Sequence, residues 1–124
     1  MPAPSTPAVL VVDDDKCMRE LLRIHLSNAG YSVITAEDAV AALKCLLKRP
    51  PRLMIVDVNM PYMDGIEFVH AVRADAAFAH MPIVFLTARE DVDEASRKAG
   101  ALACLKKPLL ADEFLSVVHA ALSR

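Results

Sequence analysis

The sequence predicts an α/β domain in which a five-stranded parallel sheet is covered by helices on both faces. Five short apolar runs read as buried strands, and five segments with helical patterning alternate with them along the chain. With 124 residues, 55% of them hydrophobic, the chain has enough apolar side chains for one full core. We therefore predict one domain over residues 8–124, preceded by a flexible Pro-rich tail over residues 1–7.

The strands are predicted from runs of four or five residues that are mostly apolar, which is typical of a parallel sheet buried on both sides. The second run is the weakest, because it contains only the apolar pair Val33-Ile34 before its last residue. The predicted strands cover residues 8–12, 32–36, 53–56, 82–86 and 102–105.

The helices are predicted from apolar residues three or four positions apart and from residues that begin or end helices. Gly30 and Gly100 end the first and fourth helices, and Pro50-Pro51 ends the second. Asp64 followed by Glu67 resembles a capping box that begins the third. The other four helices are predicted over residues 16–28, 38–48, 91–98 and 111–123. The apolar positions at helical spacing include Met18, Leu21, Leu22 and Leu26, then Val40, Leu43, Leu46 and Leu47, and then Phe114, Val117, Val118, Ala121 and Leu122.

Composition and charge exclude several classes of protein. The formal net charge is −2 and the basic residues occur only in small groups, so we expect no direct DNA binding. The three cysteines, an odd number without metal-ligand spacing, indicate reduced thiols and a cytoplasmic location. No apolar run approaches the ~18 residues that would predict a membrane span, so we expect no membrane partner.

Charged or nucleophilic side chains follow four of the five predicted strands. Asp13 and Asp14 come after the first strand, Asp57 after the third, Thr87 after the fourth and Lys107 after the fifth. The carboxyl ends of parallel strands meet at one edge of a sheet, and neighbouring strands lie about 4.8 Å apart. We therefore expect these side chains to lie together, whereas Lys106 is expected to be a solvated neighbour.

If the first and third strands are neighbours, two carboxylates at this spacing need a bound cation, or the site holds a proton. Without one, they would repel each other by ~4 kcal/mol at an effective dielectric near 20. Mg²⁺ prefers oxygen ligands at about 2.1 Å, which carboxylates supply. A metal, a free carboxylate, a hydroxyl and an ammonium together suit phosphoryl transfer. Asp57 is the better nucleophile candidate, because Asp13 and Asp14 form a pair suited to holding the ion.

In four segments the sequence resembles the receiver domain of two-component response regulators, and the resemblance extends over residues 8–123. The segments occur in the family's order and spacing. The resemblance implies a doubly wound, flavodoxin-like parallel sheet with strand order 2-1-3-4-5, flanked by five helices. The segments are Leu10-Val11-Val12-Asp13-Asp14-Asp15, Asp57-Val58-Asn59-Met60-Pro61-Tyr62-Met63-Asp64-Gly65, Leu86-Thr87-Ala88 and Lys107-Pro108.

The resemblance implies a role for each matching acid. Asp57 is similar in position to the family's phosphoacceptor. Asp14, Asp57 and the backbone carbonyl of Asn59 match the ligands of Mg²⁺, for which Mn²⁺ can substitute, and Asp13 assists through water. The resemblance thus implies that the acidic run after the first strand serves Asp57.

The remaining matched positions concern the response of the domain to phosphorylation and the lifetime of the acyl phosphate. Thr87 resembles the family's switch hydroxyl, and Lys107 its characteristic lysine, usually joined to the next proline by a cis peptide. Asn59 and Arg89 occupy the two positions that tune the lifetime of the acyl phosphate. Cys104 stands where the family usually has Tyr or Phe, a departure that we interpret as a small buried filler rather than a redox sensor.

The implied function is that of a phosphoacceptor signalling protein. It would take a phosphoryl group from a sensor histidine kinase or a histidine phosphotransfer protein and then change its binding to a downstream protein. We expect it to catalyse only its own phosphorylation and dephosphorylation, and not to be an enzyme for other substrates. Because the sequence ends with the last predicted helix, we expect no output domain.

Three other functions fit this sequence less well. A magnesium-dependent phosphatase of the haloacid dehalogenase type needs a second Asp two residues after the nucleophile, where this chain has Asn59. A flavin-binding module needs a Ser/Thr/Gly-rich loop after the first strand, where this chain has three acids. A pseudo-receiver that takes no phosphate is disfavoured because every matched site residue is present.

Overall fold

The computed structural model describes residues 8–60 and 63–123 and confirms the predicted alternation of strands and helices. The tail predicted over residues 1–7 lies outside the described residues, as do Pro61 and Tyr62 of the second matched segment. The strands are β1 (Val9–Val12), β2 (Val33–Ala36), β3 (Leu53–Asp57), β4 (Ile83–Thr87) and β5 (Ala103–Lys106). The helices are α1 (Lys16–Asn28), α2 (Ala39–Lys48), α3 (Gly65–Arg73), α4 (Asp93–Lys98) and α5 (Ala111–Leu122), with a short 3-10 helix η1 (Ala76–Phe78) before β4.

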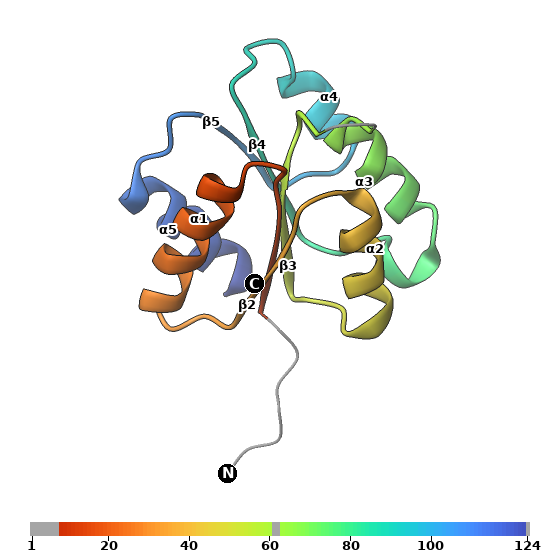
Figure 1. Ribbon diagram of the computed structural model, residues 1–124. Helices are drawn as coiled ribbons and strands as arrows, with labels where there is room; N and C mark the ends of the chain where they lie inside the picture. The colour runs from red at the N-terminus through yellow and green to blue at the C-terminus, as the bar shows by residue number, and fades with distance from the viewer. Residues whose placement is uncertain (1–7, 61–62, 124) are drawn as a thin grey trace.

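The five strands form one parallel sheet in the order β2-β1-β3-β4-β5, which confirms the predicted fold class. Figure 1 shows α1 and α5 on one face of the sheet and α2, α3 and α4 on the other. The strand order reverses between β1 and β3, which lie side by side. In a doubly wound sheet, this reversal is where ligands bind.

Alternate residues of the strands enter two separate apolar cores. In β1, Val9 and Val11 pack toward α1 and α5, whereas Leu10 and Val12 pack toward α2 and α3. β1, β3 and β4 are buried along their whole length. Burying one large apolar side chain stabilises a fold by about 1.5–3 kcal/mol, so these three strands form a rigid platform for the residues at their ends.

Aspartate side chains cap the amino ends of α1, α2 and α3, which fixes where these helices begin. The capping box expected in α3 is only half formed. Asp64 accepts a hydrogen bond from the Ile66 N–H, but within the described chain Glu67 makes no return bond to the Asp64 backbone. α4 begins at Asp93, two residues later than predicted: Val92, whose side chain is buried in the core, is its N-cap residue and has a non-helical backbone with φ −110° and ψ 2°.

Some of the apolar residues at helical spacing face solvent instead of the core. α2 lies against β2, the edge strand, and β1, and it buries only Ala42 and Leu46. The contact of α2 with these two strands is too narrow to cover the other apolar side chains of the helix. The exposed residues are Leu21 of α1 and Val40, Leu43 and Leu47 of α2, each at least 43% exposed. Within the described chain, no helix combines the length and apolar character needed to cross a membrane.

Gly65, the first residue of α3, lies against the backbone that carries Asp57. A Cβ atom at this position would overlap the Asp57 carbonyl oxygen and come within 2.9 Å of Val58 Cα. Backbone atoms cannot rotate away as a flexible side chain does, so we expect Gly65→Ala to lower the free energy of unfolding by about 3 kcal/mol. Denaturant unfolding of the two proteins measures this loss.

Gly30 offers the matched control for that substitution. Its φ is +95°, but nothing lies within 4 Å of a Cβ built there. Gly30→Ala should therefore cost only the strain of left-handed backbone, about 1–2 kcal/mol. Equal losses at the two glycines would contradict the steric explanation for Gly65.

Candidate metal centre at the carboxyl edge of the sheet

The four strand ends singled out in the sequence meet at one edge of the sheet. Asp13 directly follows β1, Asp57 is the last residue of β3, and Thr87 is the last residue of β4. Lys107 follows β5, and its backbone N–H donates a hydrogen bond of 2.7 Å to the Thr87 carbonyl oxygen. The parallel register of the neighbouring strands aligns these ends.

Asp13, Asp14 and Asp57 form a cluster of carboxylates. Each offers one oxygen, and these oxygens all lie within 4.8 Å of one another. Asp13 and Asp57 are buried, whereas Asp14 is exposed. Two charges about 4 Å apart repel by ~4 kcal/mol at an effective dielectric near 20, so the cluster needs a compensating positive charge.

Asp13 has one engaged carboxylate oxygen and one without a hydrogen bond. Oδ1 accepts a 2.9 Å hydrogen bond from the backbone N–H of Asp15. Oδ2 is buried and accepts no hydrogen bond within the described chain, although the Lys107 ammonium lies 3.5 Å away as an ion-pair partner. Leaving a buried acceptor unsatisfied costs about 1–3 kcal/mol. The acids present therefore fit a cation that prefers oxygen ligands, such as Mg²⁺.

Burial raises the pKa of Asp13 from 3.8 to about 6, against the effect of the Asp15 hydrogen bond and with the help of the nearby Asp57 charge. The metal-free folded chain therefore holds the Asp13 proton more tightly than the unfolded chain does. This contribution to stability is fully present below about pH 3.8 and is lost as the pH rises through about 6. The ionised form of Asp13 is the one that gains from a bound cation.

Binding of Mg²⁺ should weaken on acidification, because a proton on Asp13 competes with the ion. With a single competing proton of pKa about 6, the apparent affinity should fall about tenfold between pH 7 and pH 5. Calorimetric titration at the two pH values measures the change. Asp13→Asn cannot take up this proton and should show a weaker dependence; a tenfold loss in that variant as well would contradict the assignment.

Lys107 supplies a fixed positive charge to the cluster. Its Nζ donates to Asp57 Oδ2 at 3.2 Å. Burial alone would lower the pKa of Lys107, but the charges of Asp13 and Asp57 outweigh burial and raise that pKa above the ordinary value of 10.5. Lys107 is therefore protonated throughout the neutral pH range. Its peptide bond to Pro108 is cis, as the family resemblance implied.

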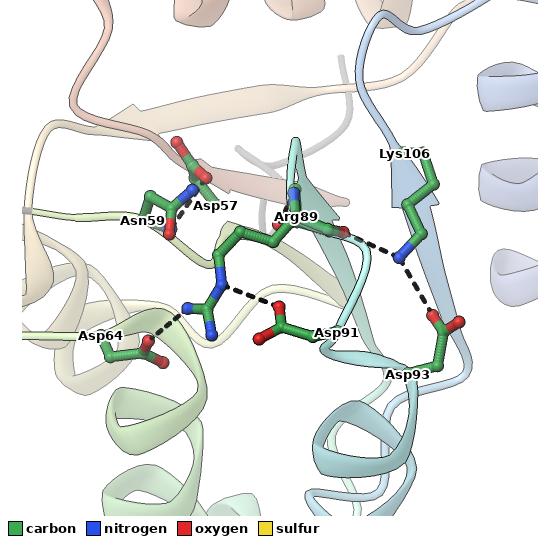
Figure 2. A network of polar contacts seen from close by, with 8 residues as sticks. Asp57, Asn59, Asp64, Arg89, Asp91, Asp93 and Lys106 are labelled. Carbon is green, nitrogen blue, oxygen red and sulfur yellow. Dashed lines mark hydrogen bonds and ion pairs between the residues drawn. The ribbon is translucent and has the colours of Figure 1, made fainter.

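Asn59 and Thr87 both lie at the carboxyl edge of the sheet, after β3 and at the end of β4. The backbone N–H of Asn59 donates a 3.0 Å hydrogen bond to Asp57 Oδ1, so the loop after β3 is held against that carboxylate (Figure 2). Asn59 as a metal ligand through its carbonyl stays a prediction. Thr87 is fully buried, and its Oγ1 accepts a 2.9 Å hydrogen bond from the Arg89 backbone N–H. The Thr87 hydroxyl thus sits at the base of the loop between β4 and α4.

The Arg89 guanidinium is held by two acids. Its Nε lies 3.2 Å from Asp91 Oδ1, and its Nη1 lies 3.4 Å from Asp64 Oδ2. Figure 2 shows the guanidinium between these carboxylates, directed away from Asp57. The hydrogen bond from Arg89 lowers the pKa of Asp91. To pair with a phosphate on Asp57, Arg89 would have to leave both partners.

Lys106 is partly exposed, in line with a solvated neighbour, but its ammonium also has partners within the fold. Its Nζ donates to the Arg89 carbonyl oxygen at 2.9 Å and to Asp93 Oδ1 at 3.3 Å, so it ties β5 to the loop before α4 and to the start of α4 (Figure 2). These partners are 17 and 13 residues away in the sequence. No local pattern signals such a contact.

Cys104 occupies the position of the family's usual aromatic ring and is half-buried against the core beneath α2, α3 and α4. Burial raises the pKa of its thiol. A protonated, partly covered thiol is a poor nucleophile and packs as a small apolar group. These features agree with the interpretation of Cys104 as a filler.

Comparison with known proteins decides the family. The family model described as the response regulator receiver domain matches residues 9–119. The chain belongs to the response regulator receiver family. It is 42% identical over 118 residues to response regulator MprA of Mycobacterium sp. (strain KMS), a match that covers 94% of this chain and 50% of that protein. The match to response regulator MprA of Mycobacterium leprae (strain TN) has the same identity and covers 94% of this chain and 51% of that protein.

Solved structures of receiver-type proteins have the same fold as this receiver domain. Chemotaxis protein CheY4 of Vibrio cholerae has a TM-score of 0.87 and 34% identity, covering 94% of this chain and 99% of that one. A putative response regulator from Chloroflexus aurantiacus J-10-fl has a TM-score of 0.89 and 34% identity, covering 97% and 100%. The chain spans about half the length of the curated relatives it matches.

Proposed function

We propose that this receiver domain accepts a phosphoryl group on Asp57, with Mg²⁺ bound beside it. The donor would be the phosphohistidine of a sensor histidine kinase or of a phosphotransfer protein. The observation that carries the proposal is the setting of the Asp57 carboxylate. One of its oxygens is held by Lys107 and the other by the Asn59 N–H, with two further acids alongside for a cation.

The transfer exchanges one bond to phosphorus for another. An Asp57 oxygen attacks phosphorus, the bond from phosphorus to the donor imidazole nitrogen breaks, and that nitrogen keeps the electron pair. In this proposal Lys107 pairs with the phosphoryl oxygens, and the Thr87 hydroxyl donates a hydrogen bond to one of them. When held by Asp13, Asp14, Asp57 and the Asn59 carbonyl, Mg²⁺, or Mn²⁺ in its place, neutralises negative charge on those oxygens.

The proposal limits catalysis to the chain's own phosphorylation and dephosphorylation. Asn59 supports this limit, because it lacks the acidic proton that a phosphatase of the haloacid dehalogenase type uses at that position. The proposed direct partners are the phosphodonor and a downstream protein, and include neither DNA nor a membrane. A cytoplasmic location belongs to the proposal, supported by the three free cysteines.

We propose that phosphorylation changes the binding of partners at the surface formed by α4, β5 and α5. The loop before α4 connects this surface to the site, because Arg89 bonds to Thr87 through its N–H and to Lys106 through its carbonyl. A shift of the Thr87 hydroxyl toward a phosphate would break the first of these bonds. The hydrogen bond from Lys106 to the Arg89 carbonyl would transmit the movement of the loop to β5.

Acetyl phosphate tests the proposal without knowledge of the natural donor. With Mg²⁺ present, the intact mass of the chain should increase by one phosphoryl group, and a chelator should prevent the gain. No gain at any Mg²⁺ concentration would overturn the proposal. Continuous release of phosphate from small phosphate esters, over many turnovers, would favour the phosphatase instead.

Arg89→Ala should change the lifetime of the acyl phosphate by less than about threefold, because the guanidinium points away from Asp57 and its removal breaks only exposed ion pairs to Asp64 and Asp91. The decay of the phosphorylated mass after removal of acetyl phosphate measures this lifetime. A change above tenfold would mean that the guanidinium leaves these acids for the phosphate. Asp91→Asn, which removes one partner while keeping Arg89, would then test that movement.

A further inference from the structure

Arg19 in α1 is bonded to the backbone of the acidic turn after β1. Its Nη1 donates a 2.8 Å hydrogen bond to the Asp13 carbonyl oxygen, and the side chain is half-buried. The Asp13 N–H is bonded on its other side to the Ala36 carbonyl oxygen at the end of β2. Both backbone groups of Asp13 therefore have a partner outside the turn, and the carbonyl's partner is Arg19.

The Asp14 carboxylate has no support of this kind. It is exposed, and none of the hydrogen bonds within residues 8–60 and 63–123 involves its side chain. Even so, one of its oxygens lies within 4.8 Å of oxygens of Asp13 and Asp57. The direction of the Asp14 side chain must therefore come from its backbone.

The peptide group between Asp13 and Asp14 is planar, so its orientation is set by the direction of the Asp13 carbonyl. A hydrogen bond that holds this carbonyl therefore also fixes the position of the Asp14 backbone nitrogen, which belongs to the same peptide group. We propose that Arg19 is a positioning residue for the metal centre, which orients this peptide so that the Asp14 carboxylate faces Asp13 and Asp57. The inference rests on the proposed function, because it assumes that the three acids hold Mg²⁺.

The charge of Arg19 alone would have the opposite effect. A guanidinium near the cluster repels a divalent cation, so its removal would tighten Mg²⁺ binding if charge were all that mattered. Loss of positioning would weaken Mg²⁺ binding, because Asp14 would then sample directions away from the ion. The sign of the change in affinity therefore separates the two effects.

The test measures Mg²⁺ binding to the full chain by calorimetric titration. We expect Arg19→Met to bind Mg²⁺ about tenfold more weakly than the wild type, the usual size of effect for a residue that orients a metal ligand. At saturating Mg²⁺ its phosphorylation by acetyl phosphate should return to the wild-type rate. Arg19→Lys, which keeps the charge and N–H donors on a shorter side chain, should recover part of the affinity.

Arg23→Met is the matched control. Arg23 lies one helical turn further along α1 and pairs with Glu20, so its replacement removes the same charge from the same helix without touching the acidic turn. Its Mg²⁺ affinity should equal that of the wild type. Unchanged or tighter binding in folded Arg19→Met would overturn the inference, and where that variant does not fold, Arg19→Ala, which also removes the donor, provides the same test. A wild-type chain that binds no Mg²⁺ would overturn the proposed metal centre itself.

Discussion

Asp57→Asn is expected to reduce phosphorylation of the chain to less than about 1% of the wild-type level, because the amide lacks the ionised oxygen that attacks phosphorus. The substitution keeps the shape of the side chain in its buried position at the end of β3. It also removes one of two neighbouring buried negative charges, so the metal-free variant should be at least as stable as the wild type.

Intact mass after treatment with acetyl phosphate and Mg²⁺ measures the first effect, and thermal unfolding measures the second. Asp14→Asn is the comparison variant, because it changes an acid of the same cluster that is not the proposed nucleophile. Asp14→Asn should still be phosphorylated at high Mg²⁺ concentration. A normal mass gain in Asp57→Asn would show that another side chain accepts the phosphoryl group.

Lys107→Met should affect metal binding and phosphorylation in opposite directions. The ammonium contacts both Asp57 and Asp13, so its loss leaves two buried carboxylates without a cation. Mg²⁺ then becomes their main compensating charge and should bind several times more tightly. At saturating Mg²⁺ the phosphorylation rate should fall by about 100-fold, because the positive charge that pairs with the transferred phosphoryl oxygens is lost.

Lys106→Met is the control for this pair of effects. It removes the same charge from the adjacent residue, whose ammonium contacts Arg89 and Asp93 rather than the buried acids. Its Mg²⁺ affinity and phosphorylation rate should stay within about threefold of the wild type, as expected for exposed contacts. Equal slowing in the two variants would mean that general charge, and not contact with Asp57, explains the role of Lys107.

The parts of the fold that could be predicted are those where a local pattern has one physical cause. The apolar runs of β1, β3 and β4 are buried on both faces, so their sequences alone identify them as inner parallel strands. The acids and the lysine could be grouped because the ends of parallel strands must meet at one edge. The order of the strands came from the family resemblance.

The remaining features depend on contacts between distant parts of the chain. Val40 and Leu47 fit a helical stripe, yet they are exposed because α2 lies at the edge of the sheet. Lys106 and Arg19 resemble ordinary surface cations in the sequence. Their hydrogen bonds to backbone carbonyls form only when the loops at the carboxyl edge of the sheet are folded.

The most direct test of the central claim is to locate the phosphoryl group chemically. Borohydride reduces an aspartyl phosphate to an alcohol and leaves free carboxylates unchanged, so the acceptor becomes homoserine and is found by peptide mass spectrometry. After treatment with acetyl phosphate and Mg²⁺, we expect reduction at residue 57 and at no other acid. Reduction at Asp13 or Asp14, or a phosphorylated chain that shows none at Asp57, would contradict the claim.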